Sequence, residues 1–334
     1  MFGNLRILIV AILIAVTPAT PAHAEAIELL NVSYDPTREL YRAINESFVA
    51  QYKAQTGNDL TVNRSHGGSS TQARAVIDGL GADVVTLAMF TDTDAIRKAG
   101  LISSGWRERL PNDSLPYVST IVFVVRKGNP KGIKDWPDII RPGIEIVTPN
   151  PKTSGNGQLS LLAAWGSVIL RGGAEKDALD FITKLYKQAP VLDSGARAAT
   201  TTFVQKRIGD VHLAWENEAH LEVKEAGKGE LEIVIPPISI LAEPRVAVVD
   251  ANVKRNGTRE AAEAYLSFLY SEAGQEIIAK NFYRPTNPAI LQKYAAIFPD
   301  TKLFPITDIA KDWDAARLKF TGDGSIFDSI YKPK

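Results

Sequence analysis

Regular alternation of short apolar strands with amphipathic helices constrains the fold of this 334-residue chain more than any other feature. The segment Ile27–Val32, predicted to be a buried strand, precedes a helical pattern in which Leu40, Ile44 and Phe48 stand four residues apart on one face. Similar strand-and-helix pairs recur as far as residue 270. This pattern predicts an α/β protein with mostly parallel, doubly wound sheets.

The ends of the first helix carry recognisable signals. Asp35 is predicted to be its N-cap, and Pro36 suits the first helical position because its missing N–H would be unpaired there anyway. Gly57 is expected to end the helix in the left-handed conformation.

Two extended β-branched runs, Ser119–Arg126 and Val246–Val249, interrupt the alternation and suggest that the chain passes more than once between two lobes. We expect the first lobe to comprise residues 25–115 and 245–334, and the second lobe residues 116–244. Ligands of such sheets bind beyond the carboxyl ends of the strands, which places a ligand in the cleft between the lobes.

Residues 1–24 have the composition of a cleaved secretory signal. Arg6 is their only charged residue, Ile7–Val16 is uninterrupted apolar sequence, and Ala22-His23-Ala24 is a small-x-small cleavage site. Ten apolar residues are too few to span a bilayer. The chain has no cysteine, so we expect neither disulfides nor a lipid anchor on a cysteine, and we expect the periplasm as its location. Lys plus Arg equal Asp plus Glu, at 38 each, which argues against a nucleic-acid partner.

Three loops of one design lie between a predicted strand and a predicted helix: Ser65–Ser70, Lys152–Gly157 and Asp193–Arg197. Each offers backbone N–H groups at a helix start, a glycine that permits close approach, and a hydroxyl. One such loop alone is an ordinary helix cap. Three helix starts that converge would present about +1.5 charge units without any lysine, which predicts a site for a compact anion.

The donors in these loops favour an anion that only accepts hydrogen bonds, such as sulfate, because every oxygen of a buried dianion must find a donor. Hydrogen phosphate also needs an acceptor, for which Asp35 and Asp193 are the nearby candidates. Trp215 follows a predicted strand and its indole N–H could donate to the ion. Arg197 could approach the anion or form a pair across the cleft.

Several motifs along the chain resemble those of the periplasmic sulfate-binding proteins: "LLNVSYDPTREL", "SHGGSSTQA", "STIVFVVRKGNPK", "VTPNPKTSGNG", "VLDSGARAATTTFV" and "AWENEA". The resemblance covers about residues 27–330. It implies a type II periplasmic binding protein with two α/β lobes joined by hinge crossovers. It further implies a substrate-binding subunit of a sulfate/thiosulfate ABC importer, a monomer that works with permease and ATPase subunits in the membrane.

The resemblance also implies how the ion is held: by main-chain N–H groups, hydroxyls and a tryptophan N–H, without a cationic side chain. The matched positions are Asp35, Ser69, Ser154, Gly155, Asn156, Ala196, Arg197 and Trp215. Ser69 is expected to donate both its hydroxyl and its N–H, whereas Asp35 and Arg197 match residues close to the ion. The family commonly has glycine where this chain has Asn156, a residue that keeps the N–H and tolerates positive φ. Residues 157–160 also differ from the usual pattern.

Other functions remain as alternatives. A preference for thiosulfate, molybdate or phosphate is compatible with a donor-rich site. The "HGGS" at residues 66–69 resembles the oxyanion-hole loop of esterases, but the nucleophile motif Gly-x-Ser-x-Gly does not occur, so we expect no enzyme activity. His66, His212 and His220 fit no standard zinc spacing, and we expect neither a metal nor a cofactor.

Overall fold

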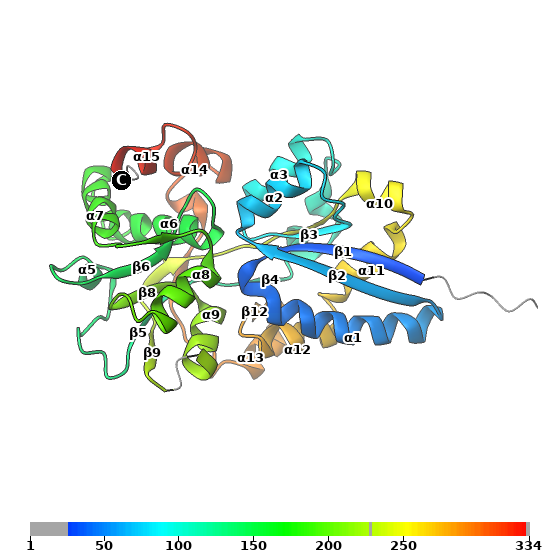
Figure 1. Ribbon diagram of the computed structural model, residues 1–334, viewed down its shortest axis with the longest axis horizontal. Helices are drawn as coiled ribbons and strands as arrows, with labels where there is room; N and C mark the ends of the chain where they lie inside the picture. Colours follow the sequence, from blue (N-terminus) through cyan, green and yellow to red (C-terminus); the bar gives the residue numbers. More distant parts are fainter. Residues whose placement is uncertain (1–25, 227–228, 332–334) are drawn as a thin grey trace, which may run out of the picture.

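The computed structural model describes residues 26–226 and 229–331, which form two α/β lobes side by side (Figure 1). One lobe contains the N-terminal segments drawn in blue and cyan together with yellow and orange segments. The other contains the green segments and the red C-terminal helices. The predicted signal segment 1–24 lies outside the described residues.

Within the described residues, the first lobe is built on a four-stranded sheet with the order β11-β3-β1-β2. Its strands are β1 (Ala26–Tyr34), β2 (Asp59–Gly67), β3 (Val84–Thr86) and β11 (Val246–Val248). Strand β1 runs parallel to both β2 and β3, and β11 pairs antiparallel with β3 at the edge. Parallel strands need crossover connections, which the helices between them provide.

Helices cover both faces of this sheet. The elements are α1 (Arg38–Thr56), α11 (Arg259–Phe268) and α12 (Glu272–Lys280) on one face, and α2 (Ser69–Ile77) and α3 (Phe90–Lys98) on the other. Leu40, Ile44 and Phe48 of α1 are buried, as their spacing predicts. Gly57 caps α1 with φ of 78°, so the predicted end of this helix is confirmed.

The second lobe has a five-stranded sheet over the same described ranges, with the order β7-β6-β8-β5-β9. Its strands are β5 (Ile121–Arg126), β6 (Ile146–Pro149), β7 (Leu192–Asp193), β8 (Val211–Trp215) and β9 (Leu231–Val234). Strand β6 is parallel to β7 and β8, whereas β5 is antiparallel to β8 and β9. Helices α6 (Gly155–Ile169) and α7 (Glu175–Lys187) pack on one face, and α8 (Ala196–Thr200) and α9 (Glu216–Leu221) on the other.

The other elements connect or extend these two cores. They are η1 (Asp35–Thr37), η2 (Trp106–Arg109), α4 (Pro111–Ser114), β4 (Tyr117–Val118), α5 (Trp136–Ile139), η3 (Thr201–Gln205), η4 (Glu222–Ala226), β10 (Ile238–Ile240), α10 (Asp250–Asn256), β12 (Arg284–Pro285), α13 (Pro288–Lys293), β13 (Lys302–Phe304), η5 (Ile306–Asp308), α14 (Trp313–Phe320) and α15 (Ile326–Ile330).

The chain crosses between the lobes more than once, as predicted. Two crossing segments lie side by side where Ser119 and Ala242 exchange backbone hydrogen bonds of 3.1 and 2.9 Å. A later crossing leads from β12 to β13, which pairs with β10.

The C-terminal segment corrects the predicted lobe boundaries, which assigned residues 245–334 to the first lobe. Residues 302–331 pack on the second lobe: the rings of Phe320 and Trp165 lie 5.0 Å apart, and those of Phe327 and Tyr186 lie 5.1 Å apart. Figure 1 shows α14 and α15 above α6 and α7. The apolar pattern of a short helix does not indicate which of two hydrophobic cores the helix will pack against.

Candidate functional site

The three predicted loops meet between the lobes, at the carboxyl ends of the sheets' strands. The second and third loops are joined by the Asn150 N–H, which donates to the Asp193 carbonyl at 2.7 Å, and by the Thr153 hydroxyl, which donates to the Ser194 carbonyl at 2.9 Å. Gly68 in the first loop lies against this pair, because a β-carbon placed on it would be only 2.4 Å from the Thr153 carbonyl oxygen.

Each of the three loops ends in a helix that has no side-chain cap. The N-cap residues are Gly68 for α2, Ser154 for α6 and Gly195 for α8, and none of them makes a capping hydrogen bond with its side chain. The N–H groups in the first turn of a helix have no partner within the helix. Three sets of these donors, with the positive ends of three helix dipoles, therefore lie close together where the lobes meet.

The structure gives the Ser69 hydroxyl other partners. It donates to Asp92 Oδ2 at 2.6 Å and accepts from the Ala88 N–H at 3.1 Å. Burial raises the pKa of Asp92 to about 6, although the Ser69 hydroxyl bond acts in the opposite direction. The expected hydroxyl donation from Ser69 to a ligand is therefore replaced by a bond within the first lobe, which leaves the backbone N–H of Ser69 at the helix start.

Trp215 is the last residue of β8 and is fully buried. Its indole Nε1 has no hydrogen-bond partner among the described residues. The ring of Tyr34, from the first lobe, lies 5.2 Å from the Trp215 ring. A buried donor without a partner costs about 1–3 kcal/mol, so this N–H is a strong candidate for a ligand contact.

Asn156 lies in the first turn of α6 and its side chain is buried. Its Nδ2 donates to the Leu213 carbonyl at 2.9 Å, which ties the start of α6 to β8. Its φ is not positive, so the predicted tolerance for the left-handed conformation is not used here. The backbone N–H remains at the helix start together with those of Gly155 and Ala196.

The sequence predicts Asp35 as the N-cap of the first helix, and this prediction is wrong. Asp35 is instead the first residue of η1. Tyr34 is the N-cap of η1 and Thr37 that of α1, and the Asp35 carboxylate accepts from Arg38 Nη2 at 2.6 Å. The sequence Asp-Pro fits both arrangements. Asp35 is buried and its Oδ2 faces Gly195 of the second lobe.

Arg197 forms a pair across the cleft, one of the two arrangements considered from sequence. Its Nη1 and Nη2 donate to Glu39 of the first lobe at 3.3 and 3.0 Å, and Nη2 also donates to Glu218 at 3.0 Å. Burial raises the pKa of Glu218 to about 8, with Arg197 acting in the opposite direction. Burial alone would lower the pKa of Arg197, but Glu218 and Glu39 together raise it. Sequence reasoning missed both glutamates because they lie 158 and 21 residues away.

Further hydrogen bonds hold the lobes together around the loops. Gln158 Nε2 donates to the Ser70 hydroxyl at 3.1 Å, and Asn217 Nδ2 donates to the Pro36 carbonyl at 3.0 Å. His66 contributes no positive charge at neutral pH, because burial lowers its pKa to about 4. The donors at the three helix starts are therefore neutral, and the Arg197 guanidinium beside them is paired with Glu39 and Glu218.

In the ranges 26–226 and 229–331, no three His, Cys, Asp or Glu side chains gather as a metal would require. No helix in the described part of the chain is long and apolar enough to cross a membrane.

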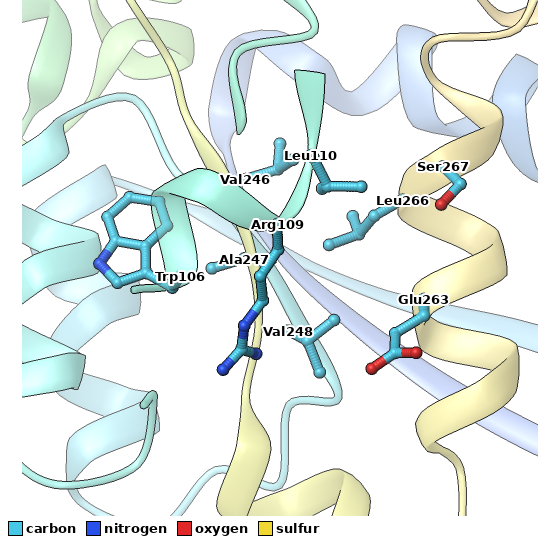
Figure 2. Close-up of a pocket in the computed structure, with 9 residues that line it drawn as sticks. All are labelled: Trp106, Arg109, Leu110, Val246, Ala247, Val248, Glu263, Leu266 and Ser267. Carbon is cyan, nitrogen blue, oxygen red and sulfur yellow. The ribbon is translucent and has the colours of Figure 1, made fainter. Parts of the chain in front are cut away.

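A separate pocket of about 310 Å³ lies within the first lobe, between η2, β11 and α11 (Figure 2). Its wall is mostly apolar and includes Trp106, Leu110 and Leu266. Arg109 is bonded to Asp250 at 2.9 Å, and Glu263 to Arg259 at 3.2 Å, so its two charged residues already have partners. None of the predicted site residues lines it.

Two α/β lobes with donor-rich loops that meet between them have the architecture of a solute-binding protein. The chain belongs to the family of bacterial extracellular solute-binding proteins, which it matches over residues 32–284. This family consists of solute-binding proteins, which agrees with the prediction that the chain is not an enzyme.

Close relatives confirm the resemblance stated from the motifs. The chain is 53% identical over 315 residues to the sulfate-binding protein of Escherichia coli (strain K12), covering 94% of this chain and 96% of that protein. It is 51% identical over 313 residues to the thiosulfate-binding protein of Pseudomonas aeruginosa, covering 93% of this chain and 94% of the relative.

Solved structures confirm the fold as that of type II periplasmic binding proteins. The sulfate-binding protein SubI from Mycobacterium tuberculosis H37Rv superposes with a TM-score of 0.79 at 32% identity, over 86% of this chain and 97% of that chain. A periplasmic thiamin binding protein shares the fold with a TM-score of 0.62 at 20% identity, over 84% and 90% of the two chains.

Proposed function

We propose that this protein binds sulfate in the periplasm and delivers it to an ABC importer in the membrane. The observation that carries the proposal is the set of buried, neutral donors between the lobes: three uncapped helix starts and the unpartnered indole N–H of Trp215. The names of the E. coli and M. tuberculosis relatives support sulfate as the ligand.

In this proposal the ion accepts hydrogen bonds from neutral groups of both lobes. The donors are the backbone N–H groups of Ser69, Gly155, Asn156 and Ala196, the Ser154 hydroxyl and the Trp215 indole. Asp35 and Arg197 border the ion, and their charged side chains are occupied by Arg38 in one case and by Glu39 and Glu218 in the other.

The lobes open and close around the ion. One lobe meets the ion first, and closure brings the remaining donors to its free oxygens, so the closed form is stable only when the ion is fully coordinated. The importer's permease and ATPase subunits then receive the ion from the closed, monomeric protein. Residues 1–24 act as the export signal.

A thiosulfate preference is the second candidate, favoured by the 51% identity to a thiosulfate-binding protein. Thiosulfate differs from sulfate by one sulfur in place of one oxygen, so most donors would serve both ions. Hydrogen phosphate should bind less well than sulfate, because its proton needs an acceptor and the backbone and indole N–H groups proposed for the site can only donate.

Isothermal titration calorimetry with sulfate tests the proposal, followed by competition with thiosulfate, molybdate and phosphate at pH 7. We expect sulfate to bind with micromolar affinity or better, about −8 kcal/mol, and phosphate to compete at least about 100-fold less well. An absence of sulfate binding, or a stronger affinity for phosphate than for sulfate, would contradict it.

A further inference from the structure

Three glycines lie where the first lobe meets the second. A β-carbon on Gly68 would be 2.4 Å from the Thr153 carbonyl oxygen and 3.2 Å from the Ser194 carbonyl oxygen. One on Gly155 would be 2.6 Å from the Ala88 β-carbon, on the opposite side of the cleft. Non-bonded heavy atoms normally approach to about 3.5–4.0 Å, so no side chain fits at these positions while the lobes are together.

Gly195 is the third glycine at the junction of the two lobes. Its β-carbon would be 2.6 Å from Asp35 Oδ2, again in the other lobe. None of the three glycines has a φ that requires glycine: φ is −59° at Gly68 and −161° at Gly195, and Gly155 begins a right-handed helix. Gly57 is the opposite case, with φ of 78° and open space around it. Close approach, rather than backbone conformation, is thus what demands glycine here.

The neighbours of two of these glycines cannot move aside by rotating a side chain. Thr153 meets Gly68 with its backbone carbonyl, and its N–H is held by the Asn150 carbonyl at 3.1 Å. Ala88 is buried, and its N–H is bonded to Ser69 Oγ. An added methyl group at Gly68 or Gly155 would therefore hold the lobes apart.

From these contacts we infer that Gly68, Gly155 and Gly195 are the stops that set how far the cleft closes. The inference deepens the proposed function and rests on it. Donors of both lobes must come within about 2.7–3.2 Å of one ion, and hydrogen bonds weaken steeply when the geometry is lost. A separation of the lobes by part of an ångström would remove contacts on the far side of the ion, although every donor is still present.

The Ala88 contact allows a reciprocal test. Gly155→Ala adds a methyl group at this contact, and Ala88→Gly removes the one that it would strike. The next neighbours of the new β-carbon, Met89 Cγ at 3.4 Å and Ser69 Cβ at 3.5 Å, are at ordinary distances. Affinity is measured calorimetrically with sulfate or thiosulfate, whichever the parent binds more tightly, so that a wrong choice of ion is distinguishable from a wrong account of closure.

We expect Gly155→Ala to weaken binding by about tenfold or more, and the double variant to return to within about threefold of Ala88→Gly alone. Gly68→Ala faces a backbone oxygen and should weaken binding at least as much, whereas Gly195→Ala faces a movable carboxylate and should weaken it less. Gly81→Ala is the matched control, since its nearest neighbour is Arg255 Nη2 at 3.6 Å, and it should bind like the parent.

Two further measurements separate closure from folding. Thermal unfolding without ion should leave Gly155→Ala near the parent, because the lobes are free to separate, while the added stabilisation by the ion should shrink. Small-angle X-ray scattering should show compaction on ion addition in the parent and the double variant, but less in Gly155→Ala. The inference is overturned if Gly155→Ala and Gly68→Ala bind as tightly as the parent, or if Ala88→Gly gives no recovery.

Discussion

The Trp215→Phe variant isolates one donor of the proposed site. In the structure the indole is fully buried, Tyr34 packs against it, and its N–H has no partner in the described part of the chain. Phenylalanine keeps an aromatic ring at this position but removes the N–H. The variant should therefore bind sulfate more weakly.

The size of the effect follows from the kind of bond that is lost. A hydrogen bond to a charged group contributes about 1.5–3 kcal/mol, which corresponds to an increase of roughly 10- to 150-fold in the dissociation constant. If the parent binds with a constant of about 1 μM, then 1 mM sulfate stabilises it by about 4.1 kcal/mol, and a tenfold weaker variant gains about 2.7 kcal/mol.

Titration calorimetry measures the affinity, and thermal unfolding with and without 1 mM sulfate provides the second readout. Trp165→Phe is the matched control: Trp165 is buried in the same lobe against Phe320, away from the loops. The control should lose thermal stability but keep its sulfate affinity. If Trp215→Phe bound sulfate as tightly as the parent, Trp215 would not contact the ion.

Two other variants test charges around the cleft. Glu39→Gln weakens the pair that joins Arg197 to the first lobe, a partly exposed contact worth about 0.2–1 kcal/mol, so sulfate affinity measured calorimetrically should fall by up to about fivefold at low salt. A variant with unchanged affinity at low salt would show that this pair does not support closure. His66 has a folded-state pKa of about 4 against 6.5 when unfolded, so the folded protein loses stability as the pH falls from 6.5 towards 4. His66→Gln should reduce this loss by at most about 3 kcal/mol in urea unfolding at pH 7.5 and 4.5, and parallel losses in both proteins would refute the assignment.

Local signals in the sequence predict most of the architecture. The alternation of strands and helices, the four-residue spacing in α1 and the glycine at its end depend on neighbouring residues, and the structure agrees with each of them. The three loops are recognisable for the same reason, because a strand end, a glycine and a helix start follow one another in the chain.

Contacts between distant residues account for what the sequence does not reveal. The partner of the Ser69 hydroxyl is 23 residues away, and Arg197 reaches a glutamate 158 residues away. The packing of α14 on the second lobe depends on the contact of Phe320 with Trp165, which is far away in the sequence. The sequence indicates that the loop glycines permit a ligand to approach closely. It does not indicate that Ala88 lies next to Gly155, a contact that exists only when the lobes are together.

A crystal structure of the protein with sulfate at high resolution tests most directly whether neutral donors alone hold the ion. We expect the sulfate oxygens to lie about 2.7–3.2 Å from the N–H groups of Gly155, Asn156 and Ala196, the Ser154 hydroxyl and Trp215 Nε1. Arg197 should remain bonded to Glu39 and Glu218. A sulfate bonded directly to the Arg197 guanidinium, or one that leaves the helix starts without contact, would contradict the account.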